Sequence, residues 1–192
     1  MSYLILNGMY KDDSFIPKIN ELVSKELVKR DVKGETIDLH KNAIKPCLGC
    51  FKCWIQTPGV CIIDDYAREV AKKMIQADNL IYLTPVHFGG YSSELKKALD
   101  RSICLMLPFF RVYKEEIHHE TRYDKYPNLI VIGTLEEPNL KQEEIFSELV
   151  ERNVLNNFAP KHATQIIYHS DDESTVKKKV EEGVRIVGDD ND

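Results

Sequence analysis

Short uninterrupted runs of apolar residues, separated by stretches with helical spacing, form the main pattern along the chain. Four runs are clear: residues 3–6 (YLIL), 80–83 (LIYL), 129–132 (LIVI) and 165–168 (QIIY). A weaker fifth run covers residues 35–39 (ETIDL). None alternates strictly between apolar and polar side chains, and continuous runs of this length are typical of strands buried on both faces of a parallel sheet. The pattern predicts five parallel strands.

Between these runs, apolar residues recur at spacings of three and four, which is typical of helices that bury one face. Acidic or serine residues precede several of these segments, as helix N-termini favour. The predicted buried faces, one group for each helix, are Ile16, Ile19, Val23 and Leu27; Val70, Ala71 and Met74; Leu95, Leu99 and Ile103; Ile145, Leu149 and Val150; and Val176, Val180, Val184 and Val187.

Strands that alternate with helices indicate βαβ units and a doubly wound α/β fold. We expect a flavodoxin-like five-stranded parallel sheet of order 2-1-3-4-5, with helices on both faces. Residues 1–188 are expected to form one domain, and the acidic end, residues 189–192, a disordered tail. Ligands of such sheets bind beyond the carboxyl ends of the strands, so the loops that follow the apolar runs are the candidate sites.

Composition and charge exclude several classes of protein. The formal net charge of -5 argues against a general binder of nucleic acids or anionic membranes. The first residues lack the basic region of a signal peptide, and no apolar run reaches the length of a membrane span. We expect a cytoplasmic protein without nucleic-acid or membrane partners. Thiols stay reduced in that compartment, where clustered cysteines bind metal or do redox chemistry more often than they form disulfides.

Four of the five cysteines lie within one short segment, and they are Cys47, Cys50, Cys53 and Cys61. Three thiols at intervals of three positions can wrap three corners of a cubane cluster, and the fourth can arrive from a short loop. Zinc sites more often use two separated Cys-x2-Cys pairs. We predict a four-iron, four-sulfur cluster on these residues, with a loop of reduced thiols as the alternative. Cys104 lies alone in an apolar stretch and is expected in the core.

Two segments carry a resemblance to a known family. Residues 46–65 (PCLGCFKCWIQTPGVCIIDD) resemble a Pro-Cys-x-Gly-Cys-x-x-Cys pattern followed by a fourth cysteine and paired acids. Residues 83–101 (LTPVHFGGYSSELKKALDR) resemble a third strand, a flavin loop and the helix after it. In both respects the chain resembles the NADPH-dependent FMN reductase and iron-sulfur flavoprotein family. We interpret Asp64 and Asp65 as acids at the start of a helix rather than as metal ligands.

The resemblance implies FMN as the redox centre and assigns flavin contacts to three loops. The implied cofactor-binding residues are Gly8, Lys11, Ser14, Pro85, Val86, His87, Phe88, Gly89, Gly90 and Thr134. The first loop departs from the family pattern, because Met9 replaces a serine and Asp12 and Asp13 stand beside the place of a phosphate dianion. The alternative is that these acids point outward and cap the following helix, whose N-terminal N–H groups still face the phosphate. The third loop carries Glu136 and Glu137 where many relatives have glycines.

Three functions remain open from the sequence. The first is an FMN-dependent electron-transfer oxidoreductase with a 4Fe-4S cluster, which takes electrons from NAD(P)H or a ferredoxin-like donor and passes them to a small-molecule or protein acceptor. The second is a clusterless NAD(P)H-dependent FMN or quinone reductase. The third, of another class, is a metal-binding or interaction protein with a degenerate flavin site, which the changed loops favour.

The apolar stretch CLMLPFFRVY, residues 104–113, predicts assembly. It is longer than the preceding helix needs, and a monomer has to cover it or leave an apolar patch exposed. We expect a homodimer or homotetramer, with the cysteine segment and residues 104–126 near the subunit contact. The alternative is that Leu105, Leu107, Phe109 and Phe110 complete the core of a single chain.

Overall fold

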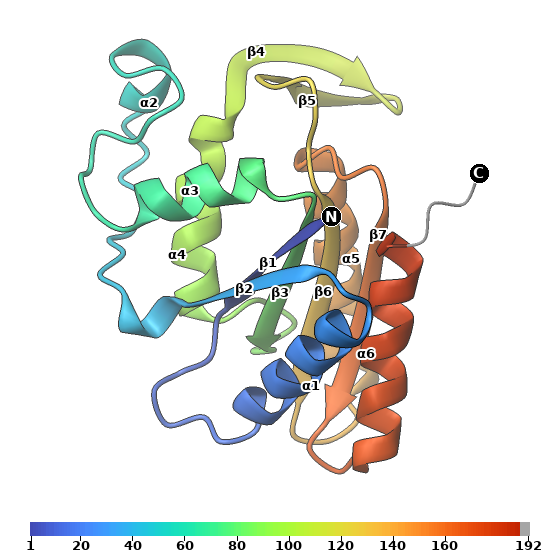
Figure 1. Cartoon of the computed structure of the whole chain (residues 1–192). Helices are drawn as coiled ribbons and strands as arrows, with labels where there is room; N and C mark the ends of the chain where they lie inside the picture. The colour runs from blue at the N-terminus through green and yellow to red at the C-terminus, as the bar shows by residue number, and fades with distance from the viewer. Residues whose placement is uncertain (189–192) are drawn as a thin grey trace.

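Five parallel strands form the central sheet of this protein, whose computed structural model describes residues 1–188. The strands are β1 (Ser2–Asn7), β2 (Lys33–Asp38), β3 (Asn79–Pro85), β6 (Asn128–Leu135) and β7 (His162–Tyr168), and they lie in the order β2-β1-β3-β6-β7 (Figure 1). The strands β6 and β7 are the fourth and fifth strands of this sheet along the chain, so the order is the predicted 2-1-3-4-5. The flavodoxin-like fold is therefore confirmed. The acidic end expected to be a disordered tail lies outside the described residues.

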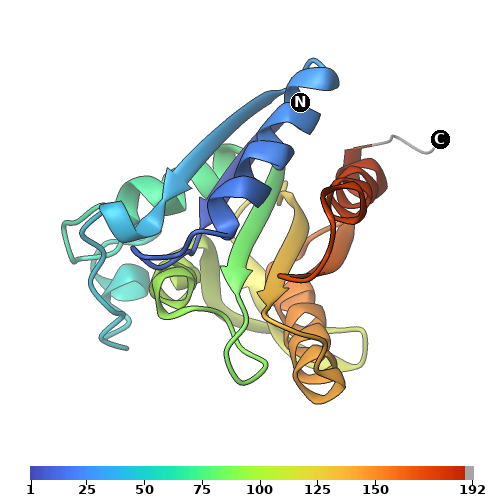
Figure 2. The same cartoon turned by 90° about the horizontal axis from the view of Figure 1, so that it is seen from below.

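Helices cover both faces of the sheet, as Figures 1 and 2 show. Successive residues of a strand point to opposite faces, so each apolar run contributes side chains to the hydrophobic core on both sides of the sheet. Tyr3 and Ile5 pack with α1 (Ile16–Lys29) and α6 (Glu173–Gly188). On the other face, Leu4 and Leu6 belong to a core that takes in buried residues of three helices. These helices are α3 (Ala67–Gln76), α4 (Ser93–Arg101) and α5 (Leu140–Asn156).

Two of the predicted helical faces differ from those observed. In α5 the buried side chains are Phe146, Val150 and Val154, whereas Ile145 is 44% exposed. The helix is rotated by one position from the prediction because the aromatic Phe146 fills the core. Helix α4 ends at Arg101, and the chain continues as a 3-10 turn, η2 (Ser102–Leu105), so Ile103 lies beyond the α-helix.

An antiparallel hairpin, which the sequence pattern did not predict, follows η2. It consists of β4 (Met106–Tyr113) and β5 (Glu116–Thr121), which pair only with each other (Figure 1). The turn between them, Lys114 and Glu115, has positive φ angles of 50° and 64°. Shorter elements, η1 (Leu39–Lys41) and α2 (Lys52–Ile55), lie between β2 and α3.

The two candidate sites lie at opposite ends of the molecule. The loops that leave β1, β3 and β6 gather at one end, whereas α2 and the hairpin lie at the other (Figure 1). Helix α4 runs between the two ends, and its nine residues correspond to about 13 Å of rise. No helix within residues 1–188 is both long and apolar enough to cross a membrane.

Candidate functional site

The loop after β1 is held tightly against the start of α4 through Gly8. The Gly8 N–H donates to the Leu83 carbonyl at 2.8 Å, and the Ser92 hydroxyl donates to the Gly8 carbonyl at 2.6 Å. A Cβ at Gly8 would lie 2.8 Å from both Leu95 Cβ and Ser92 Oγ. Only glycine allows this approach, which brings the loops after β1 and β3 together.

The loop after β3 folds into a two-residue turn of type I′. The His87 N–H donates to the Gly90 carbonyl at 3.0 Å, and the Gly90 N–H donates back at 2.8 Å. The central residues, Phe88 and Gly89, have φ angles of 52° and 75°, as this turn requires. A Cβ at Gly89 would meet Ile145 Cγ2 at 2.5 Å, so the turn rests directly on α5. It presents the Phe88 ring, 95% exposed, at its tip.

A cavity of about 280 Å³ separates this turn from the loop after β6. Val86, His87 and Phe88 line one side, and the other side is formed by Leu135, Glu136, Glu137, Asn139 and Gln142. Pro85 and Thr134 are paired in the sheet directly behind the cavity, where the Val86 N–H donates to the Thr134 carbonyl at 2.9 Å. The backbone of the turn and the cavity beside it offer a surface against which a flat ring system could lie.

The phosphate end of the implied flavin site is already occupied by a carboxylate of the chain. Asp13 Oδ1 accepts hydrogen bonds from the N–H groups of Phe15 and Ile16, both at 2.9 Å. Pro17 offers no N–H in the first turn of α1. The remaining predicted phosphate ligands, Lys11 and Ser14, are exposed and do not line the cavity. The residues present therefore fit the ring of a flavin better than its phosphate.

Two residues at this end were missed by sequence reasoning. The Tyr10 ring lies 5.5 Å from the His87 ring, centroid to centroid, and its hydroxyl accepts from the Ser93 N–H at 3.3 Å. Tyr10 thus bridges the loops after β1 and β3. Ser92 caps α4 by accepting from the Leu95 N–H, while its hydroxyl holds Gly8. The cap was visible in the sequence, but the long-range contact to Gly8 was not.

The four clustered cysteines sit at different depths around one segment. Cys53 is buried, Cys47 and Cys61 are half-buried, and Cys50 is exposed; none forms a disulfide. Burial raises the pKa of the Cys53 thiol, and the charges of Cys61, Cys47 and Cys50 raise it further, so the other three thiols lie within electrostatic range. The Gly49 N–H donates to Cys47 Sγ at 3.5 Å.

The thiols do not form a site for a single ion. Among residues 1–188, no group of three or more His, Cys, Asp or Glu side chains is arranged to hold a metal ion. In a cubane cluster each thiolate binds a different iron, so its ligands stand farther apart than those around one ion. Gly49, between Cys47 and Cys50, has a φ of 62° and no atom of any residue beyond its two chain neighbours within 4 Å of the place where its Cβ would lie. Cysteine thiolates are nevertheless the donor type that iron-sulfur clusters use.

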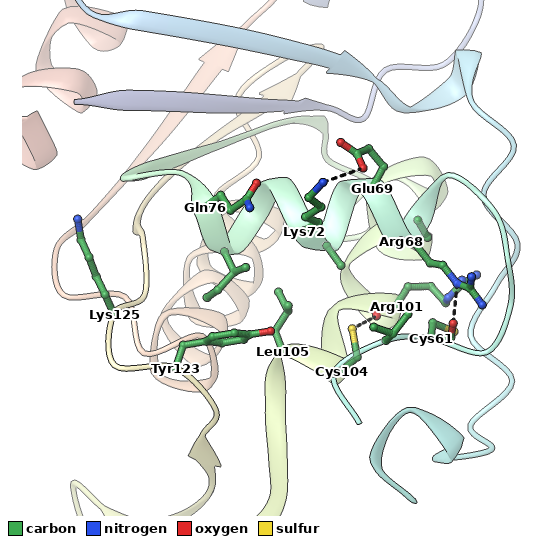
Figure 3. Close-up of a pocket in the computed structure, with 15 residues that line it drawn as sticks. Cys61, Arg68, Glu69, Lys72, Gln76, Arg101, Cys104, Leu105, Tyr123 and Lys125 are labelled. Carbon is green, nitrogen blue, oxygen red and sulfur yellow. Dashed lines mark hydrogen bonds and ion pairs between the residues drawn. The ribbon is translucent and has the colours of Figure 1, made fainter. Parts of the chain in front are cut away.

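A second cavity, of about 640 Å³, lies between α3 and the chain that carries Cys61, Cys104 and Leu105 (Figure 3). Cys104 is 2% exposed, and burial raises the pKa of its thiol to about 11, which confirms its predicted place in the core. Two arginines that sequence reasoning missed, Arg68 and Arg101, also line this cavity.

The two acids before α3 have different partners. The Asp65 carboxylate accepts from the Ala67 N–H at 3.1 Å, as expected of an acid at a helix start, and also pairs with Arg101 at 2.9 Å. Asp64 is exposed and pairs with Arg68 at 2.9 Å. Neither carboxylate faces another acid in a metal-binding arrangement within the described part of the chain.

Known proteins similar to this chain fall into two groups. An iron-sulfur flavoprotein of Methanocaldococcus jannaschii is 39% identical over 83 residues, which cover 43% of this chain and 42% of that protein. An iron-sulfur flavoprotein of Methanosarcina thermophila is 36% identical over 77 residues, 40% of this chain and 39% of that protein. The matches thus span about two-fifths of the length of these relatives.

Solved structures share the fold at low identity. An NAD(P)H:quinone oxidoreductase from Methanothermobacter marburgensis superposes with a TM-score of 0.70 at 16% identity, covering 96% of this chain and 98% of the other. An FMN-dependent NADH-azoreductase from Bacillus anthracis, solved with FMN, gives 0.64 at 15% identity over 95% and 97%. A family model described as NADPH-dependent FMN reductase matches residues 1–120. That match covers more than half of the chain, which therefore belongs to the NADPH-dependent FMN reductase family.

Proposed function

We propose that this chain is a flavin-dependent oxidoreductase that binds FMN where the loops after β3 and β6 meet. The observation that carries the proposal is the type I′ turn at residues 87–90, which presents its backbone beside the 280 Å³ cavity. Membership of the FMN reductase family supports the choice of flavin. The electron donor is NAD(P)H or a ferredoxin-like protein, and the acceptor is a small molecule or a protein.

The residues of the chain act by binding and orientation. FMN, when bound, supplies both hydride and single-electron chemistry. The two turn bonds between His87 and Gly90 leave the N–H groups of Phe88 and Gly89 at the tip, where they can donate to a ring oxygen. The Tyr10 and His87 rings, 5.5 Å apart, hold the loops after β1 and β3 beside each other, which would help to orient a ring bound at this end.

We further propose that Cys47, Cys50, Cys53 and Cys61 hold one 4Fe-4S cluster. The spacing of the four cysteines within one short segment supports this, as do the names of the archaeal relatives. A cluster moves one electron at a time and FMN takes one or two. A chain with both would connect a one-electron donor to a two-electron acceptor.

Substitution of Cys50 by serine tests the cluster. Cys50 is exposed, so the variant should fold as the wild type does while losing bound iron and sulfide after anaerobic reconstitution. Cys104→Ser is the matched control, because Cys104 is a buried core thiol outside the proposed ligand set. Four irons per chain in Cys50→Ser, or zinc as the sole metal of the wild type, would refute the cluster.

A clusterless NAD(P)H-dependent flavin or quinone reductase is the second candidate. It is favoured by the lack of a metal-binding group among residues 1–188. The capping of α1 by Asp13 favours the third candidate, a metal-binding or interaction protein that has lost the flavin. The absorption spectrum of anaerobically purified protein separates the three. Bound flavin gives resolved absorption bands, and a cluster adds a broad shoulder to them. The third candidate shows no flavin bands.

A further inference from the structure

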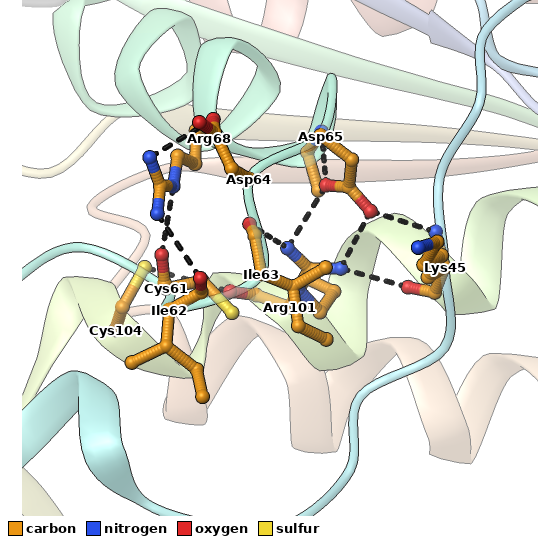
Figure 4. Close-up of polar contacts among 10 residues, drawn as sticks. Lys45, Cys61, Ile62, Ile63, Asp64, Asp65, Arg68, Arg101 and Cys104 are labelled. Atoms are coloured by element: carbon orange, nitrogen blue, oxygen red, sulfur yellow. Dashed lines mark hydrogen bonds and ion pairs between the residues drawn. The ribbon is translucent and has the colours of Figure 1, made fainter.

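Arg101, the last residue of α4, is buried directly behind the cysteine segment. Its side chain is 1% exposed, and it forms a two-pronged ion pair with Asp65 at 2.9 and 3.0 Å (Figure 4). The same guanidinium donates to the carbonyls of Lys45 and Ile63 at 2.9 and 3.0 Å. Arg101 therefore contacts the chain both before the first cysteine and after the last.

Asp65 completes this connection. Besides Arg101, its carboxylate accepts from the Lys45 N–H at 2.9 Å and from the Ala67 N–H at 3.1 Å. Lys45 stands two residues before Cys47, and Ile63 stands two residues after Cys61. The Arg101–Asp65 pair thus joins the two ends of the cysteine segment into a closed loop anchored on α4 and α3.

A second arginine holds the same turn from the other side. Arg68 donates to the carbonyls of Cys61 and Ile62 at 2.8 and 3.1 Å, so the two guanidinium groups together hold three successive carbonyls, 61 to 63 (Figure 4). The Arg68 side chain is 35% exposed, whereas Arg101 is enclosed. Of the two arginines, Arg101 is therefore the one whose hydrogen bonds must come from the folded cysteine segment, because water does not reach its guanidinium.

One donor of Arg101 is left over. Its Nε–H is buried and has no hydrogen-bond partner among the described residues, and the Cys61 side chain lies beside the same guanidinium. A buried ion pair is by itself weak evidence for stability, since apolar replacements often fold as well. The hydrogen bonds from Arg101 to the carbonyls of Lys45 and Ile63 indicate that Arg101 positions the cysteine segment rather than stabilises the whole fold.

We propose that Arg101 is a positioning residue of the cysteine segment, which joins the ends of that segment and so holds Cys61 beside the other three thiols. This inference rests on the proposed function in assigning those thiols to a cluster. Bringing the fourth ligand in from a free loop costs closure entropy, and a loop that is already closed removes that cost from cluster assembly.

Alkylation of the metal-free protein tests the position of Cys61 directly. Iodoacetamide is applied at about pH 9.5, where an ordinary thiol is mostly ionised, and the rate at each cysteine is mapped by mass spectrometry. In Arg101→Lys, and in a double variant Arg101→Met with Asp65→Asn, Cys61 should react several-fold faster relative to exposed Cys50. The double variant avoids leaving a lone buried carboxylate, so it should fold even if a single Arg101→Met does not.

Two controls make the outcome specific. Arg152→Met removes an exposed arginine elsewhere and should leave the Cys61 to Cys50 ratio unchanged. Cys104 should stay protected in all variants, and a parallel rise at Cys104 would show general loosening and overturn the proposal. An unchanged ratio in both Arg101 variants would overturn it as well.

Iron uptake separates this inference from the proposed function. If the wild type reconstitutes a cluster, the Arg101 variants should retain less iron and sulfide per chain, because Cys61 is no longer held beside the other three thiols. If the wild type binds no iron while the alkylation ratio still shifts, the cluster assignment fails and the positioning role of Arg101 stands.

Discussion

The Asp65 carboxylate makes the free energy of unfolding of the chain depend on pH. Burial alone would raise the pKa of this carboxyl, but hydrogen bonds from Arg101 and from the Lys45 and Ala67 N–H groups hold it below its ordinary value. A carboxyl with a lower pKa in the folded state stabilises that state above the unfolded pKa, and the contribution is lost as pH falls. We expect the free energy of unfolding to decrease as pH falls below about 4.

Urea denaturation of the wild type and Asp65→Asn between pH 7 and pH 3 measures this contribution. The variant should be less stable at pH 7, and the difference should shrink below about pH 4, because the introduced amide does not titrate. Other carboxyls with lowered pKa values, such as Asp38 and Asp78, titrate in both proteins and cancel in the comparison. A difference that stays constant down to pH 3 would contradict the assignment.

Gly89 and Gly90 should respond differently to substitution. Gly89→Val places a β-branched residue at a φ of 75° and a Cβ 2.5 Å from Ile145 Cγ2. Strain and overpacking together should lower the unfolding free energy by on the order of 3 kcal/mol. Gly90→Ala meets only the His87 carbonyl at 3.4 Å, so its stability should change by less than about 1 kcal/mol. Chemical denaturation measures both.

The effect of this loop on flavin affinity is therefore better tested with Gly90→Ala than with Gly89→Val, because only Gly89→Val should also destabilise the fold. A methyl group on the proposed flavin loop should weaken FMN binding in fluorescence titration without disturbing the fold. Equal affinity in Gly90→Ala and the wild type would count against the proposed place of the ring.

At the residue scale, the sequence revealed groups that carry their chemistry locally. The cysteines were found because thiols at short spacing are unusual in themselves. Arg101 was not found, since its partners Lys45 and Asp65 lie 56 and 36 residues away and leave no local pattern. The same holds for Ser92, whose hydroxyl bonds to Gly8 over 84 residues.

At the scale of the elements, the N-terminus of α1, where Asp13 lies, is expected to affect the affinity for the phosphate of FMN. Asp13→Asn keeps an oxygen for the N–H groups of Phe15 and Ile16 but removes the charge. Repulsion between unit charges about 4 Å apart in water is about 1 kcal/mol, so FMN should bind roughly five-fold tighter to the variant. Riboflavin has no phosphate, and its affinity should not change.

The measurement is a pair of fluorescence titrations, with FMN and with riboflavin. Asp31→Asn is the matched control, because Asp31 follows the opposite end of α1 and tolerates asparagine at its φ of 55°. If Asp13→Asn changed both affinities equally, or neither, the phosphate would not be reaching this helix end.

Elements with strong periodicity were predicted well, and those that depend on turn geometry were not. The four clear apolar runs all lie inside observed strands. The hairpin β4–β5 was missed because its turn uses Lys114 and Glu115 at positive φ, where glycine or asparagine usually gives the signal. Pro108 lies within β4, and proline is uncommon inside strands, so the sequence of this segment is not typical of a strand.

At the scale of the whole molecule, one surface joins the hairpin and the cysteine segment. Ring contacts run from Phe51 through Trp54 and His119 to Phe110, with centroid distances of 5.0, 4.9 and 4.6 Å. Trp54 Nε1 also donates to the Met106 carbonyl at 2.9 Å. The hairpin is thus fixed to the segment, and both lie far from the flavin loops of the same chain (Figure 1).

One face of the hairpin is apolar and open. Val112 pairs directly with Ile117, and Phe110 lies on the same side of the ribbon. These three side chains, the hairpin face, are 76%, 75% and 65% exposed. Grouped apolar exposure of this kind marks an interaction surface more often than an isolated residue does. Phe109 and Phe110 do not complete the core of the chain, since both are more than 60% exposed.

We expect the hairpin face to bind a second copy of the chain. Because the two candidate centres of one chain lie at opposite ends of α4, pairing is also a way to bring the cysteine segment of one subunit toward the flavin loops of another. A cyclic dimer is the commonest closed assembly. Light scattering after size-exclusion chromatography should give about twice the 22.2 kDa chain mass at micromolar concentration.

The double variant Val112→Lys with Ile117→Glu should shift the protein to the mass of one chain. Opposite charges at paired positions keep the hairpin favourable, so the variant removes the apolar contact rather than the ribbon. Val28→Lys, at a 76% exposed position on α1, is the matched control and should remain assembled. A wild type that runs as a single chain would show the prediction of assembly to be wrong. An assembled double variant would move the contact to another surface.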